Sequence, residues 1–171
     1  MVKTSVLCLL SSVLWTGCSH YQLGTNATLS FRTLYVAPAE NKTLLPQARE
    51  LVSAQLREAF AHDARVTLVN SPESADATLT VTLTAFHREI ATVREGDTGL
   101  ARKFNLILDA TCTLHDNRGG SGNKNFFEHR PVRVQRESFT DGGQLQSEYQ
   151  TLPLLAESLA NKVTHAVLDV W

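Results

Sequence analysis

Cysteine is scarce in this sequence: Cys8, Cys18 and Cys112 are the three in 171 residues. They do not form the closely spaced pairs that bind zinc. A disulfide-rich domain usually has an even number of cysteines, and this sequence has three. Cys112 falls on the apolar side of a predicted strand, where a cysteine is usually a buried, inert thiol. We therefore expect no internal disulfide.

Catalytic motifs are also missing. The Gly-rich segment 119–122 lacks the Lys-Ser/Thr that completes a phosphate-binding loop, and Ser121 has no nucleophile elbow around it. The six histidines are scattered, although His87, His115 and His129 could approach one another across strands. That arrangement leaves a metal-dependent envelope enzyme as an alternative. We expect no enzyme, no catalytic residue, no cofactor and no metal.

Neither charge sign predominates, and no apolar run is long. Sixteen basic and seventeen acidic side chains give a net charge of −1, which does not support a nucleic-acid partner. No stretch reaches the ~20 apolar residues of a transmembrane helix. With 43% hydrophobic and 19% charged residues, the composition is typical of one globular domain.

The N-terminal segment has the pattern of a signal peptide. Lys3 precedes a short apolar run over residues 5–14, and the small pair Thr16-Gly17 comes directly before Cys18. This ending resembles the bacterial lipobox, in which the cysteine is lipidated and becomes the first mature residue. Trp15 stands where leucine is usual, and an ordinary signal peptide with a chance cysteine is the alternative.

The domain boundaries follow from lipidation at Cys18. We predict a signal peptide over residues 1–17, a lipidated tether over 18–28 and a single domain over 29–171. Ser19 is not the aspartate that retains Gram-negative lipoproteins in the inner membrane. We therefore expect a lipid-anchored protein on the periplasmic face of the outer membrane.

The first half of the domain contains strand and helix signals. Residues 29–38 predict a strand that Pro38 ends, and residues 40–43 predict a loop. Apolar residues at three- and four-residue steps predict a helix from about Pro46 to His62-Asp63. A short strand is expected over 65–69.

Strict alternation marks the second half. Leu79, Val81, Leu83 and Ala85 alternate with threonines and predict a strand from 78 to about 94 with one buried face. A hairpin loop at 96–99, a return strand over 104–114, a last strand over 126–139 and a helix over 145–170 follow. Pro131 places the last strand at an edge or a bulge.

These elements predict an α+β fold in the order β-α-β-β-β-β-α. We expect a two-layer sandwich in which a mostly antiparallel sheet of four to five strands carries two helices on one face. The threonine-rich face should meet water or a polar partner.

Basic residues gather near the predicted hairpin and along the last strand. Arg94, Arg102 and Lys103 flank the loop at 96–99, and Arg130 and Arg133 lie on the last strand. Such groups can hold phosphates. Edge-strand protection and surface ion pairs are the alternative interpretation.

Three features together resemble the lipopolysaccharide-assembly lipoproteins, the small subunit of the outer-membrane translocon of Gram-negative bacteria. They are the lipobox cysteine followed by Tyr21 and Leu23-Gly24, the strand 34–38 leading into Glu-Asn-Lys-Thr at 40–43, and Ala-Asp-Ala at 75–77 opening the long alternating strand. His20 and Trp15 depart from the family pattern. The resemblance covers nearly the whole mature chain.

The resemblance implies a non-enzymatic role. Family members plug a β-barrel partner, assist its assembly and bind lipopolysaccharide, which implies binding residues among Arg94, Arg102, Lys103, Arg130 and Arg133. The alternative is a periplasmic lipoprotein regulator of a cell-wall synthase, or a curli-type secretion component, since both also pair a Val-Ala-Pro strand with Glu-Asn-Lys-Thr. The short tether, only about ten residues, favours the plug.

Overall fold

The computed structural model describes residues 29–93, 101–119, 124–139 and 144–169. Cys18 and Arg94 therefore lie outside the described residues. The elements occur in the order β1 (Thr33–Val36), β2 (Glu40–Asn41), α2 (Ala48–Ala61), β3 (Thr67–Leu68), a 3₁₀ turn (Pro72–Ser74), β4 (Ala77–Val93), β5 (Ala101–Asp116), β6 (Lys124–Phe139) and α3 (Gln144–Leu168).

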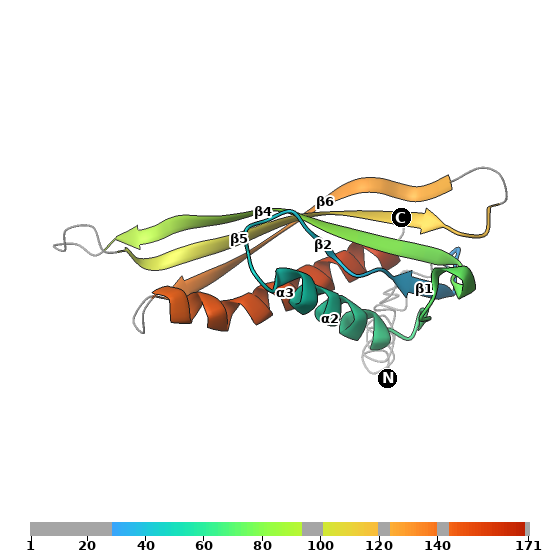
Figure 1. Cartoon of the computed structure of the whole chain (residues 1–171), viewed down its shortest axis with the longest axis horizontal. Helices are drawn as coiled ribbons and strands as arrows, with labels where there is room; N and C mark the ends of the chain where they lie inside the picture. The colour runs from blue at the N-terminus through green and yellow to red at the C-terminus, as the bar shows by residue number, and fades with distance from the viewer. Residues whose placement is uncertain (1–28, 94–100, 120–123, 140–143, 170–171) are drawn as a thin grey trace, which may run out of the picture.

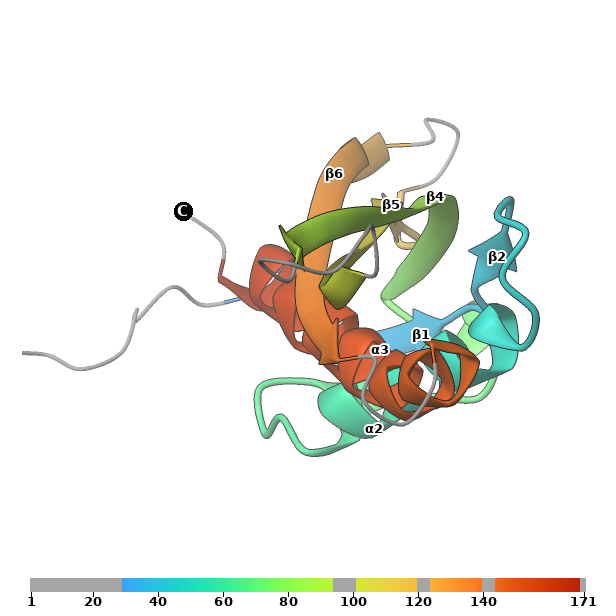
Figure 2. The ribbon, with the colours of Figure 1, turned by 90° about the vertical axis from the view of Figure 1, so that its left-hand side faces the viewer.

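The domain has two layers, a twisted sheet and a pair of helices on one of its faces (Figures 1 and 2). The sheet order is β3-β1-β4-β5-β6, with β2 paired to β4 beside this path. β1 is parallel to β3 and β4, whereas β4, β5 and β6 form an antiparallel meander. The predicted α+β sandwich with two helices on one face is confirmed.

The sheet has one strand more than the four to five predicted. The segment 40–43 was expected to be a loop, but Glu40 and Asn41 pair in parallel with Thr82 and Leu83 of β4. Pro38 interrupts the ladder because it has no N–H, and pairing resumes two residues later. The Asn41 side chain then organises the turn, accepting from Thr43 N at 2.9 Å and donating to Leu45 O at 2.9 Å.

Alternation along β4 changes phase at a bulge. Leu79, Val81 and Leu83 are fully buried as predicted, but the pairing register shifts between Leu83 and Ala85. The extra residue moves the side chains from Ala85 to Ile90 to the other face, until the register shifts again between Ile90 and Thr92. Ala85 therefore lies on the open face, where it was predicted to be buried, and Phe86 packs against the core instead.

The helices bury the expected stripes with small changes at their ends. α2 begins at Ala48 rather than near Pro46, because Gln47 has a left-handed backbone with φ of 63°. α3 contains Pro153 within its first turns and buries Leu155, Leu159, Val163 and Val167 against the sheet. Val170, predicted to end this stripe, lies outside the described residues.

β6 lies at one end of the sheet order and carries the irregularity that Pro131 predicted. The β5–β6 register shifts between Cys112 and Leu114, and His129 opposite this point has a positive φ of 48°. Cys112 is fully buried, and burial raises the pKa of its thiol to about 11. This environment fits the inert cysteine that the sequence predicted.

Asp76 joins β1 to the start of β4. Its carboxylate accepts from Arg32 N at 2.8 Å and Thr33 N at 2.9 Å, and its own N–H donates to Thr33 O at 3.1 Å. The backbone N–H of Thr33, together with that of Arg32, lowers the pKa of Asp76 below its usual value. The Ala-Asp-Ala segment is thus a structural motif that fixes where β1 meets β4.

Asp76→Asn is expected to destabilise the domain by about 1–2 kcal/mol at neutral pH, because two backbone donors lose a charged acceptor. The folded-state pKa lies below the unfolded one, so the stabilisation is present above about pH 4 and is lost as the pH falls through the folded-state pKa. Thermal melts of wild type and variant should therefore converge at acidic pH. Glu157→Gln, at an exposed carboxylate of α3, is the control. A constant difference at all pH values would contradict this role.

Candidate functional site

Three of the basic residues predicted to bind phosphates have side chains that the structure describes, and these three do not form one cluster. Lys103 lies on the open face of the sheet, near the end of the β4–β5 hairpin. Its Nζ is 2.6 Å from Glu137 Oε1 and 5.6 Å from the centre of the Phe139 ring. Arg102 is its neighbour in β5, but the Arg102 side chain lies outside the described residues, as does all of Arg94.

Arg133 is on the same open face but further along the strands. It pairs with Asp109, with Nε–Oδ1 at 2.5 Å and Nη2–Oδ2 at 3.0 Å, and this contact raises its pKa. His87 approaches the same carboxylate at 3.7 Å. Six residues of β5 separate the Lys103 and Arg133 positions, which corresponds to about 20 Å.

Arg130 has a structural environment on the helix side of the sheet. Its guanidinium lies 4.0 Å from the centre of the Phe127 ring and donates to Ala166 O near the end of α3. The hydrogen bond joins β6 to the last turn of the helix, and the Phe127 contact within β6 holds the guanidinium in place. Its part in a phosphate site stays a prediction, and the surface ion pairs of Lys103 and Arg133 agree with the alternative interpretation.

An ion pair between an exposed arginine and a buried glutamate joins the hairpin to α3. Glu148 is 7% exposed, and its Oε2 lies 2.7 Å from Arg88 Nη2. Arg88 pairs in register with Leu106, so it lies on the helix-covered face. Glu148 was not among the residues predicted from the sequence. The signal was present, because Glu148 falls at helical spacing on the apolar stripe that continues with Leu152 and Leu155.

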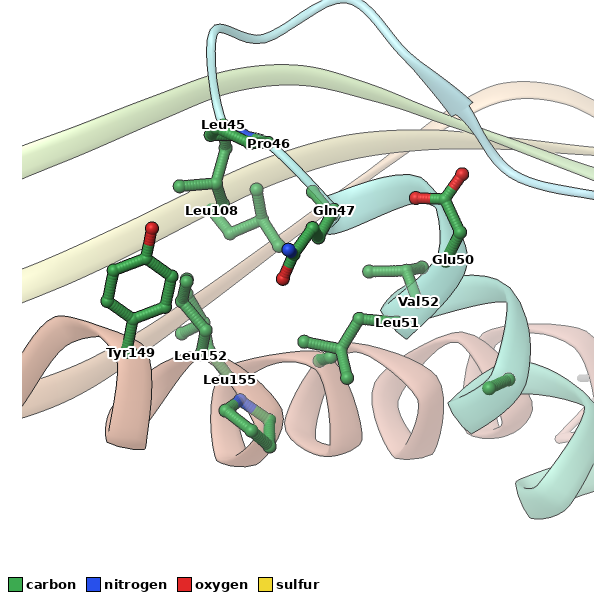
Figure 3. A pocket seen from close by; sticks show the side chains of 14 residues that line it. Leu45, Pro46, Gln47, Glu50, Leu51, Val52, Leu108, Tyr149, Leu152 and Leu155 are labelled. Atoms are coloured by element: carbon green, nitrogen blue, oxygen red, sulfur yellow. The ribbon is translucent and has the colours of Figure 1, made fainter.

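An apolar groove opens between the start of α2 and the first half of α3 (Figure 3). Tyr149, Leu152 and Leu155 come from α3, Leu51 and Val52 come from α2, and Leu45 and Leu108 lie above them. The groove has a volume of about 440 Å³. No sequence pattern indicates it, because its walls come from segments a hundred residues apart.

Over the described residues, no helix combines the length and apolar character needed to cross a bilayer. Within the same described residues, no group of three or more histidine, cysteine, aspartate or glutamate side chains is placed so that it could hold a metal ion. His87 faces Asp109, and His115 Nδ1 lies 2.6 Å from Asn125 Oδ1.

The fold is shared with small bacterial proteins of known structure. Lipoprotein B of Nitrosomonas europaea is 19% identical, with a TM-score of 0.53 over 86% of this chain and 87% of that chain. A Xanthomonas campestris protein is 13% identical, with a TM-score of 0.57 over 85% and 89%. A Chlamydia trachomatis protein is 10% identical, with a TM-score of 0.55 over 80% and 95%. No curated protein matches this sequence.

These likenesses show that the two-layer α+β fold recurs in small bacterial proteins. A model of the lipopolysaccharide-assembly (LptE) family matches residues 31–167, which is most of the domain. The protein belongs to this family. It is a lipopolysaccharide-assembly lipoprotein, and the family assignment confirms the resemblance found in the sequence. Membership also agrees with a non-enzymatic role and with a lipid-anchored protein of the outer membrane.

Proposed function

We propose that this lipoprotein plugs a β-barrel lipopolysaccharide translocon from the periplasmic face of the outer membrane, assists its assembly and binds lipopolysaccharide. The observation that carries the proposal is the division of the sheet into two unlike faces. One face is covered by α2 and α3 and the other is open (Figure 2). The side chains on the open face are mostly polar.

The open face suits a hydrated environment. Thr80 pairs with Thr113 and Thr82 with Thr111 across β4 and β5, and the face continues through the Asp109–Arg133 pair to Lys103 and Glu137. The interior of an outer-membrane barrel is polar, so a wall of this kind can contact a plug through hydrogen bonds and ion pairs. An apolar membrane surface could not satisfy these groups.

The hairpin end is the proposed place for lipopolysaccharide phosphates. Lys103 lies in β5 near this end, Arg102 precedes it in the chain, and Arg94 follows Val93, the last residue of β4. Guanidinium groups hold phosphates through paired hydrogen bonds. Arg130 and Arg133 remain secondary candidates because both lie away from the hairpin end: Arg133 pairs in register with Asp109, and Arg130 bonds to Ala166 of α3. The family assignment favours this function over the regulator and secretion alternatives.

Arg102→Glu tests the hairpin. Loss of one charged contact and the introduction of repulsion should lower lipopolysaccharide capture in cells roughly tenfold, while the melting temperature stays nearly unchanged. Capture is measured by crosslinking, purification and immunoblotting for lipopolysaccharide. Lys124→Glu makes the same charge change at the exposed start of β6, remote from the hairpin, and should capture normally. Equal capture by wild type and Arg102→Glu would remove Arg102 from the site.

A further inference from the structure

We propose that the apolar groove between α2 and α3 holds an acyl chain of the lipopolysaccharide molecule. This inference rests on the proposed function and adds a second part to the site. The phosphates would lie toward the hairpin, and one hydrocarbon chain would lie in the groove.

The lining of the groove suits an occupant without polar atoms. Of the fourteen residues around it, only Gln47, Glu50 and Tyr149 have polar side-chain groups. A volume of about 440 Å³ is within the range of ligand pockets. An extended peptide segment would bring backbone N–H and C=O groups that need partners, and this lining offers few. A saturated chain brings none.

The groove is open and its rim is partly apolar. Tyr149 in its wall is 60% exposed, and Leu44, next to the lining residue Leu45 in sequence, is 102% exposed. An exposed aromatic ring at the mouth of an apolar groove is typical of a binding surface.

Cations lie directly beyond one end of the groove. Leu108 lines it, and the next row of the same sheet face, about 7 Å along the strands, is Arg88, Leu106 and Arg136 in register. The Arg88 side chain is 48% exposed despite its bond to Glu148, so some of its five donors remain available to a phosphate. The same direction leads along β4 and β5 to the hairpin.

An apolar groove that ends in arginines is complementary to an amphiphile with a phosphorylated headgroup. Phospholipids share this chemistry, but the proposed function gives lipopolysaccharide as the ligand, in keeping with the lipopolysaccharide-assembly family. The multiply acylated cargo must also keep its hydrocarbon out of water during transfer. We therefore assign the groove to lipopolysaccharide, with phospholipid and a segment of the barrel as the competing occupants.

Photocrosslinking in cells tests the assignment with the full-length lipoprotein. p-Benzoylphenylalanine is placed at Leu51 or Leu152 in the groove, and at Glu58 or Asn161 in a polar groove further along the same two helices. We expect lipopolysaccharide adducts at the first two positions and none at the second two. A fifth position, Lys103, reports on the proposed phosphate site.

The outcomes separate the inference from the proposed function. Adducts at Lys103 without any in the groove would overturn the acyl site while the proposed function stands. Absence of lipopolysaccharide adducts at all five positions would overturn both. Groove positions that crosslink only to phospholipid, or only to protein, would show that a different molecule occupies the groove. Either result would also overturn the assignment.

A tryptophan substitution that fills the groove tests the assignment a second time, through its effect on the amount of lipopolysaccharide adduct. Leu152→Trp adds bulk to the lining at a half-buried position, whereas Leu154→Trp adds the same bulk at an exposed position outside it. With the crosslinker at Leu51, Leu152→Trp should lower the lipopolysaccharide adduct about tenfold and Leu154→Trp should leave it unchanged. Melting curves confirm that both variants are folded. An undiminished adduct in folded Leu152→Trp would contradict an acyl chain in the groove.

Discussion

Leu83→Asp is expected to abolish folding of the domain. Leu83 is fully buried in β4, pairs with Ala110 of β5 and with Asn41 of β2, and lies in the main core beneath the helices. A carboxyl group there loses its hydration without gaining a partner, and the leucine contacts are lost as well. The combined cost of about 4 kcal/mol or more is comparable to the whole stability of a small domain.

Circular dichroism and urea denaturation of the purified protein measure this effect. Thr80→Asp is the matched control, because it adds the same carboxylate to the same strand but on the open face, where Thr80 pairs with Thr113. The control should melt within a few degrees of wild type. Leu108→Asp, on β5 and 2% exposed, should behave like Leu83→Asp. A cooperative wild-type melt for Leu83→Asp would mean that this strand face is not the core.

The layers of the fold were predictable because its strands have period-two alternation. Leu79, Val81 and Leu83 predict one buried face without reference to any other segment, and α3 shows its stripe in the same way. The phase change near Ala85 was not predictable. A bulge is set by how β4 twists against β5, and no residue at that point differs from an ordinary strand residue.

The candidate site was predictable only as a set of charges. Arg130, Arg133 and Lys103 were grouped because they are basic and near strand ends. Their actual partners depend on cross-strand register, which brings Asp109 beside Arg133 and Glu137 beside Lys103. The apolar groove depends on tertiary packing of α2 against α3, so single-sequence patterns contain no trace of it.

Cys18→Ala is expected to transfer the protein from the membrane to the soluble periplasmic fraction. The prediction rests on the lipobox assignment, in which Cys18 carries more than one acyl chain. One chain gives only marginal membrane binding, and several give stable attachment, so removal of the lipidated side chain removes the anchor altogether. The melting temperature should not change, because the described core begins at Phe31, well after the tether.

The barrel partner complicates this experiment and also makes it informative. A plug that has lost its lipid could still sediment with membranes through its protein contacts. Fractionation is therefore done in cells depleted of the barrel, with mass spectrometry of the N-terminal peptide to detect the lipid. Ser19→Ala, which changes the next residue and keeps the cysteine, should stay in the membrane. Retention of Cys18→Ala without the barrel would show that another feature anchors the protein. Release that occurs only after depletion would instead show that the domain binds the barrel directly, independently of its lipid.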